Sequence, residues 1–146
     1  MNIKNPQNLN NKELKKGYLY DVIDEEKVEY CEFEEECNDK KLYDAEFENC
    51  KFNNVSMQNS ILEKITFKDV IFEKCNFSNT EFLETTFIRC KFNNCKISGC
   101  NFAEERLYNV QLTETNANYG DKLITLSTCE YSQKNGRMIV VAKKIC

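Results

Sequence analysis

Cysteine is the residue type of this chain best suited to chemistry, because a thiol can bind zinc, form a disulfide or act as a nucleophile. The 146 residues include nine cysteines and no histidine. Five of the cysteines are separated from one another by multiples of five residues: Cys50, Cys75, Cys90, Cys95 and Cys100. Their role therefore depends on the elements that carry this spacing.

A five-residue period runs from Leu42 to Leu112. Every fifth residue is large and apolar, in fifteen consecutive positions of which nine are Phe: Leu42, Phe47, Phe52, Met57, Leu62, Phe67, Phe72, Phe77, Phe82, Phe87, Phe92, Ile97, Phe102, Leu107 and Leu112. Such a period fits neither an α-helix, at about 3.6 residues, nor a strand, at about 2, so it indicates an internal repeat.

Two further registers give each unit its shape. The residue two before each large one is mostly small or β-branched, with Glu105 as the clear misfit: Ala45, Cys50, Val55, Ser60, Ile65, Val70, Cys75, Thr80, Thr85, Cys90, Cys95, Cys100 and Val110. Residues two apart in an extended segment share a face, so both should point inward. The residue two after each large one is mostly polar and turn-prone: Asp44, Asn49, Asn54, Asn59, Asp69, Asn79, Asn94, Gly99 and Asn109. Each unit is therefore predicted to be three extended residues and a corner.

The units resemble those of the pentapeptide-repeat family, as in "CKFNN" (50–54), "CNFSN" (75–79) and "CNFAE" (100–104). The resemblance covers about residues 42–116. It implies an all-β fold, a right-handed, four-sided parallel β-helix with four units per coil, so that residues twenty apart stack. Phe52, Phe72 and Phe92 should form one column under Leu112, and Phe47, Phe67 and Phe87 another under Leu107.

In this arrangement the five regularly spaced cysteines occupy the small inward position, where Cys acts as a small hydrophobe. Cys75 and Cys95 would lie one coil apart and could approach disulfide distance, but a reducing cytosol argues against the bond. A zinc site is disfavoured because neighbouring cysteines would point at different walls and no histidine is available. We therefore expect no metal and no cofactor.

Charge and hydropathy bound the class of protein. Residues 40–119 carry 10 basic and 11 acidic residues, which is not the basic surface that nucleic-acid binding requires. We find no signal peptide, and no apolar run approaches the length of about 20 residues that a membrane span requires. The expected location is therefore the cytoplasm.

The segments outside the repeat are predicted to be an N-terminal cap with a degenerate first coil (1–41) and a β-hairpin (118–146), with the β-helix between them (42–117). A faint five-residue pattern starts at Tyr18, and the step of nine from Phe33 to Leu42 indicates a register slip. We interpret 18–39 as a cap or a degenerate coil and 34–41 as a loop. In the hairpin, Asn135-Gly136 is a strong turn signal between two apolar segments.

Apolar residues also occur at outward positions: Tyr43, Ile61, Ile71, Leu83, Ile88 and Tyr108. Stacking at twenty residues would place Ile88 below Tyr108, and Leu83 below Ala103 on the adjacent wall. These two columns lie on adjacent walls near the C-terminal end and so form an apolar cluster. Such a cluster indicates a surface that another segment or molecule covers.

The hairpin contains a second resemblance, to class B sortases, in "TLSTC" (125–129) followed by Arg137 eight residues later. In that family the Cys is the nucleophile of a transpeptidase and the Arg stabilises the oxyanion. The resemblance therefore implies Cys129 as nucleophile and Arg137 as oxyanion partner, since a nearby cation favours both a thiolate and an oxyanion. It covers only about 25 residues, and the histidine that the family uses is missing from the whole chain.

The best-supported function is a non-catalytic scaffold or protein-interaction module, with an unknown protein partner and a possible homodimer through a solenoid end. One alternative is a sortase-type cysteine transpeptidase that needs a histidine in trans. Another is mimicry of duplex DNA to bind gyrase, which some pentapeptide-repeat proteins show, but this requires a strongly acidic rod and residues 40–119 are nearly neutral.

Overall fold

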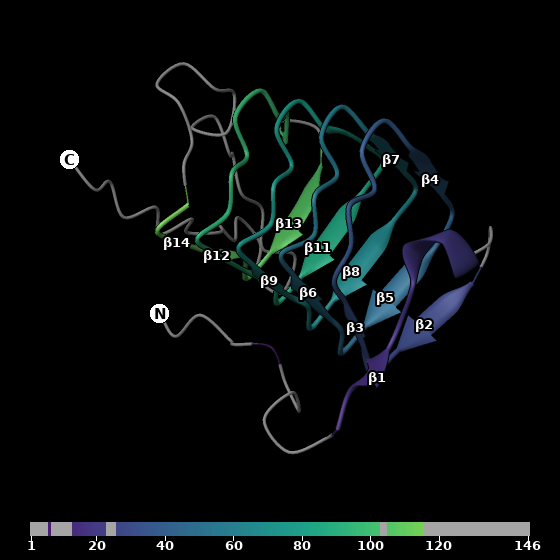
Figure 1. Cartoon of the computed structure of the whole chain (residues 1–146). Coiled ribbons are helices and arrows are strands. Elements are labelled where there is room, and N and C mark those ends of the chain that lie inside the picture. The colour runs from purple at the N-terminus through teal and green to yellow at the C-terminus, as the bar shows by residue number, and fades with distance from the viewer. Residues whose placement is uncertain (1–5, 7–12, 23–25, 103–104, 116–146) are drawn as a thin grey trace.

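The structure is a computed structural model that describes residues 6, 13–22, 26–102 and 105–115 (Figure 1). These residues form an all-β parallel solenoid, as the repeat predicted, and it has about five turns. The predicted C-terminal hairpin (118–146) lies outside the described residues, and so does Ala103, the residue expected above Leu83.

Four walls surround the interior, in the order in which the chain visits them. Wall 1 contains β2 (Lys27–Glu29), β5 (Glu46–Glu48), β8 (Thr66–Lys68), β11 (Thr86–Ile88) and β13 (Arg106–Tyr108). Wall 2 contains β1 (Lys15–Lys16), β3 (Cys31–Phe33), β6 (Lys51–Asn53), β9 (Ile71–Glu73), β12 (Lys91–Asn93) and β14 (Gln111–Thr113). Wall 3 is a row of single bridges through Glu36, Ser56, Asn76 and Lys96. Wall 4 contains β4 (Lys41–Tyr43), β7 (Ile61–Glu63) and β10 (Glu81–Leu83).

The interior is the predicted ladder of large side chains. All ten phenylalanines are buried, with exposed fractions of 4% or less. Phe52, Phe72 and Phe92 pair in register under Leu112, and the Phe72 and Phe92 rings stack with centroids 4.5 Å apart. The column of Phe47, Phe67 and Phe87 under Leu107 is also confirmed. Of the fifteen large positions only Leu42, in the end strand of wall 4, is half-buried.

Left-handed backbone marks the corners. Between residues 44 and 114, every corner residue that the structure describes has a positive φ, from 48° to 56° for the non-glycine residues and 75° for Gly99. The predicted Asn, Asp and Gly corners are confirmed. Five further corners that the sequence did not identify also adopt this conformation: Lys64, Lys74, Glu84, Arg89 and Glu114. The stacked coils impose it on residues that rarely adopt it alone.

The first coil starts at β2 and is one residue short. Phe33 pairs with Phe52, nineteen residues later, whereas Glu36 pairs with Ser56, twenty residues later. The prediction of a loop at 34–41 was therefore wrong: Glu36 lies in wall 3 and Lys41 begins β4. The missing residue lies at the corner before Glu36, which explains the register slip in the sequence.

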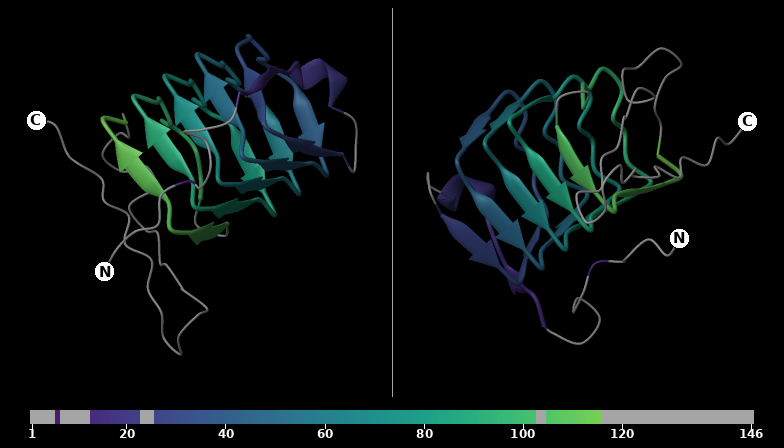
Figure 2. Two further views of the ribbon diagram at one scale, coloured as in Figure 1. Left: turned by 90° about the horizontal axis from the view of Figure 1, so that it is seen from below. Right: turned by 180° about the vertical axis from the view of Figure 1, so that it is seen from behind.

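A short segment covers the N-terminal end of the coils (Figure 2). β1 pairs with β3, and the 3-10 helix η1 (Leu19–Asp21) follows it. Leu19 is turned into the core, with 3% of its surface exposed. Residues 13–22 thus form a cap, and residues 26–41 form a coil.

Candidate interaction surface

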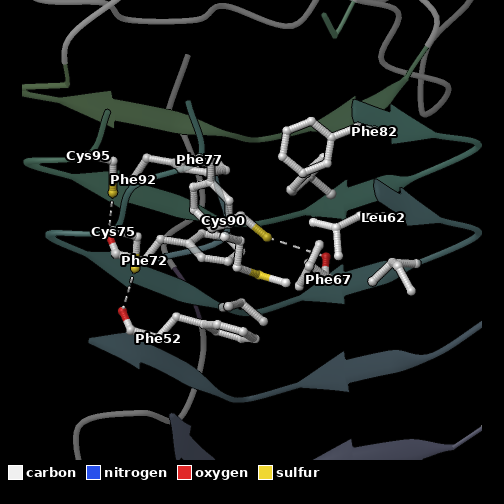
Figure 3. Packing of buried hydrophobic residues seen from close by; sticks show 14 of the residues in the cluster. Phe52, Leu62, Phe67, Phe72, Cys75, Phe77, Phe82, Cys90, Phe92 and Cys95 are labelled. Atoms are coloured by element: carbon white, nitrogen blue, oxygen red, sulfur yellow. Dashed lines mark hydrogen bonds between the residues drawn. The ribbon is translucent and has the colours of Figure 1, made fainter. Parts of the chain in front are cut away.

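The inward thiols form hydrogen bonds between coils (Figure 3). Cys75 donates to the Phe52 carbonyl oxygen at 3.2 Å, and Cys95 to that of Phe72 at 3.3 Å. In each pair the acceptor lies twenty-three residues earlier, one coil below. Hydroxyl groups at equivalent positions do the same, as in Thr85 to Leu62 at 3.0 Å. The small inward position therefore favours side chains that are small and that also carry a hydrogen-bond donor.

Burial favours the protonated form of three inward thiols, those of Cys50, Cys75 and Cys90. It raises the pKa of Cys50 and of Cys90 to about 12. The hydrogen bond with Cys95, together with burial, raises the pKa of Cys75. Because the thiolate is the reactive form for both nucleophilic attack and metal binding, the interior is unsuited to either.

The chemical alternatives raised by the cysteines find no site in the described part of the chain. Cys75 and Cys95 are free thiols. No group of three or more His, Cys, Asp or Glu side chains among these residues could hold a metal ion. Cys129 and Arg137, the two residues expected from the sortase resemblance, lie outside the described residues. No helix within the described ranges is long and apolar enough to cross a membrane.

With the interior filled, the outer walls are the surfaces available for recognition. On the N-terminal half of wall 1, the Glu48 carboxylate accepts contacts from Lys27 at 2.7 Å and from Lys68 at 2.6 Å. Hydrogen bonds from these two ammonium groups hold the pKa of Glu48 below its ordinary value. The charges on this half of the wall are thus neutralised largely by each other.

A stronger ion pair lies at the corner between walls 1 and 2. Arg89 holds Asp69 in two hydrogen bonds, Nε to Oδ1 at 2.7 Å and a terminal nitrogen to Oδ2 at 2.6 Å. The Asp69 side chain is only 5% exposed. The sequence analysis missed this pair, although opposite charges twenty residues apart in a stacked repeat were a usable signal. Such a bidentate pair links two successive coils through two charge-assisted hydrogen bonds.

The C-terminal half of wall 1 has a different composition. Ile88 pairs in register with Tyr108, as predicted, and Thr86 pairs with Arg106. We call these four residues the β11–β13 patch. Ile88 and Tyr108 are half-buried and Arg106 is exposed. Tyr, Arg and Ile at neighbouring surface positions form the kind of set found at the centre of protein interfaces.

The remaining outward apolar residues are more dispersed. Leu83 is 41% exposed on wall 4, and Glu84 at the corner separates it from β11. Tyr43 receives a hydrogen bond of 2.9 Å from the Lys64 ammonium and is thereby tied to the next coil. A hollow of about 240 Å³ beside β2 and β5 is lined by charges of both signs, among them Lys27 and Glu46.

Comparisons with known proteins agree with the fold. Residues 65–122 match a protein-family model described as a pentapeptide repeat region. This match supports the pentapeptide-repeat assignment for the repeat segment, and parallel pairing of successive coils continues on its N-terminal side, from β2 to β7. The comparison with curated proteins gave no match.

Proposed function

We propose that the solenoid is a non-catalytic scaffold that binds another protein through an outer wall. The observation that carries this proposal is the filled interior. Its thiols donate hydrogen bonds to backbone carbonyl oxygens, while the hydrogen-bonded strands present their outward side chains in columns along the walls. Rigid surfaces lose little conformational entropy on binding, which favours affinity.

The β11–β13 patch is the part of this surface best suited to a partner. The N-terminal half of wall 1 carries charges that already pair with each other, so a partner would have to replace those contacts. The patch offers an aromatic ring, an aliphatic side chain and the Arg106 guanidinium instead. Interface centres are depleted in Lys, Glu and Asp and enriched in aromatic residues and Arg.

Two other functions are less well supported. Mimicry of DNA requires long acidic surfaces, whereas wall 1 alternates lysines with glutamates. Sortase chemistry requires a proton donor for the leaving amine, and the chain has no histidine.

The patch is tested by two isoleucines of similar exposure on different walls. Ile88→Ser removes the aliphatic part of the patch, and Ile71→Ser makes the same change on wall 2. Circular dichroism and denaturant melts first establish that both variants fold. In quantitative affinity capture from the native host, the wild type and Ile71→Ser should retain the same protein, and Ile88→Ser should lose it. Equal retention by all three would exclude the patch.

The non-catalytic part of the proposal is tested at Cys129. The full chain is incubated with a sorting-signal peptide and followed by mass spectrometry, with Cys129→Ala as the control. We expect neither cleavage nor an acyl-enzyme. A thioester adduct that is absent from the control and turns over with added amine would establish a transpeptidase instead.

A further inference from the structure

The N-terminal end of the solenoid exposes a pair of aromatic rings. As the cap crosses the end, Leu19 points into the core while Tyr18 and Tyr20 point outward. Tyr18 is 37% and Tyr20 72% exposed, and their ring centroids are 5.2 Å apart. Buried aromatic rings dominate protein interfaces, so two exposed ones on a cap form a candidate contact surface.

Charged groups of both signs lie beside this pair, and the Lys16 ammonium is 5.2 Å from the centroid of the Tyr18 ring. Desolvation, followed by the negative charges of Asp21 and Glu35, raises the pKa of the Tyr20 phenol. Glu35 also accepts a hydrogen bond from the Leu19 amide, which fixes the cap to the corner after β3. Glu34 and Glu36, on either side of it, are exposed. The end face, defined here as Lys16, Tyr18, Tyr20, Asp21 and Glu34–Glu36, therefore carries two aromatic rings and is acidic on balance, with four carboxylates and one ammonium group.

Charge is also distributed unevenly along the sequence, with an acidic N-terminal segment and a basic C-terminal segment. Residues 1–39 carry 5 basic and 11 acidic residues, whereas residues 120–146 carry 5 basic and 2 acidic residues. The basic residues of the second segment are Lys122, Lys134, Arg137, Lys143 and Lys144. The segment is also rich in apolar residues, as in "MIVVA" (138–142). It is the basic part of a chain whose other parts are acidic or nearly neutral.

We propose that the end face is a docking surface for the basic segment 120–146 of a second copy of this chain. Lysine and arginine cations bind to tyrosine ring faces and to carboxylates. Because Lys16 already lies over the Tyr18 ring, the groups that complement the segment are the Tyr20 ring, which is 72% exposed, and the carboxylates. The contact joins different surfaces of the two copies and leaves one of each surface open. The result is head-to-tail association, which extends to longer assemblies unless it closes. This contact is separate from the β11–β13 patch and does not depend on it.

The first test is the effect of salt on self-association of the full chain. Sedimentation velocity with reductant present, to exclude disulfides, should show mass increasing with protein concentration at low salt. Because about 0.5 M salt shortens the Debye length to roughly 4 Å, the assemblies should dissociate there. A chain that remains monomeric at every concentration and salt, or that associates independently of salt, would overturn the proposal.

Charge reversal identifies the two surfaces. The head-reversed variant carries Glu34→Lys and Glu36→Lys, and the tail-reversed variant carries Lys143→Glu and Lys144→Glu. Each variant alone should associate at least about tenfold more weakly than the wild type, because like charges then meet at the contact. An equimolar mixture should recover association, since the basic head of one variant then meets the acidic tail of the other.

Matched controls separate this contact from a general effect of net charge. Glu81→Lys with Glu84→Lys makes the same charge change as head reversal, on wall 4 and its corner, and should leave association unchanged. Tyr20→Ser removes a ring without changing charge and should weaken association. Association that survives head reversal would assign the contact to another surface, such as a symmetric pairing of C-terminal ends. Failure of the mixture to recover would exclude the complementary contact.

Discussion

The inward cysteines act as donors as much as small hydrophobes. Cys90 donates to the Phe67 carbonyl oxygen at 3.3 Å, and Cys100 to that of Phe77 at 2.8 Å. Ser60 and Thr80 make equivalent bonds through hydroxyl groups. A carbonyl oxygen has two lone pairs, so a side-chain donor adds to what the ladder provides. This explains why Cys, Ser and Thr share a position that volume alone would leave to Ala and Val.

Titration of a buried thiol should make the protein less stable in alkali. The ordinary pKa of 9.0 is raised to about 12 at Cys90, so between these values the unfolded chain loses a proton that the folded chain retains. The free energy of unfolding should therefore decrease as pH rises, by about 1.4 kcal/mol per pH unit for each such thiol. Cys90→Ser keeps a hydrogen-bond donor and does not titrate. The free energy of unfolding of this variant should therefore decrease by that much less per pH unit than that of the wild type. Denaturant melts from pH 8 upward, with reductant present, measure the difference; parallel curves would contradict it.

The corner residues store local strain that substitution can relieve. Lys74 has φ of 53° and stacks between Asn54 and Asn94, which adopt the same conformation. Because Asn tolerates the left-handed region better than Lys, Lys74→Asn should stabilise the protein by about 0.5–1 kcal/mol. Lys96→Asn, at an exposed wall 3 position without positive φ, is the control and should give no gain. Urea melts measure the stability of both variants. Equal effects of the two substitutions would show that the gain does not come from the left-handed backbone at the corner.

At the scale of elements, the cap depends on a glycine for its close approach. A Cβ at Gly17 would lie 2.6 Å from Cε1 of Phe33. That ring cannot retreat easily, because Phe47 and Phe52 pack against it with centroids 5.6 and 4.8 Å away. The cap and the first coil therefore fit as one unit.

Gly17→Ala should accordingly displace the cap. We expect a loss of about 1–3 kcal/mol, as for other overpacked sites, and faster amide exchange in residues 13–22. Lys15→Ala, on the exposed strand β1, should change neither quantity appreciably. Hydrogen exchange followed by mass spectrometry locates the change. Unaltered protection of the cap in Gly17→Ala would show that Phe33 can move aside.

The same elements show what the sequence could predict. Fifteen evenly spaced large residues sufficed for the coils from residue 42 onward, because each unit repeats one local conformation. The first coil was harder to recognise, since one missing residue after Phe33 shifts the period and Tyr30 occupies a corner where Asn usually stands. The Arg89–Asp69 pair and the thiol hydrogen bonds depend on side-chain geometry between coils, which a single unit does not encode.

At the scale of the whole molecule, the coils form a one-dimensional stack. Phe33, Phe52, Phe72 and Phe92 form one column through four successive coils. A ring in the middle of the column packs between the coil below and the coil above. An end coil is supported from one side only. Stability should therefore depend on position along the column even when residue type, wall and burial are the same.

Truncation of two rings in this column tests that dependence. Both Phe72 and Phe33 are buried, with exposed fractions of 0% and 1%. Phe72→Ala, in the middle, should lower the global free energy of unfolding by about 3–5 kcal/mol, as buried Phe truncations do. Phe33→Ala should lower it less, because the cap and first coil can open while later coils remain folded. Amide exchange should then accelerate only in residues 13–41 for Phe33→Ala, and throughout the coils for Phe72→Ala. Equal global losses, with exchange accelerated everywhere in both variants, would mean that the solenoid unfolds as a single cooperative unit in which the end coil has no independent stability.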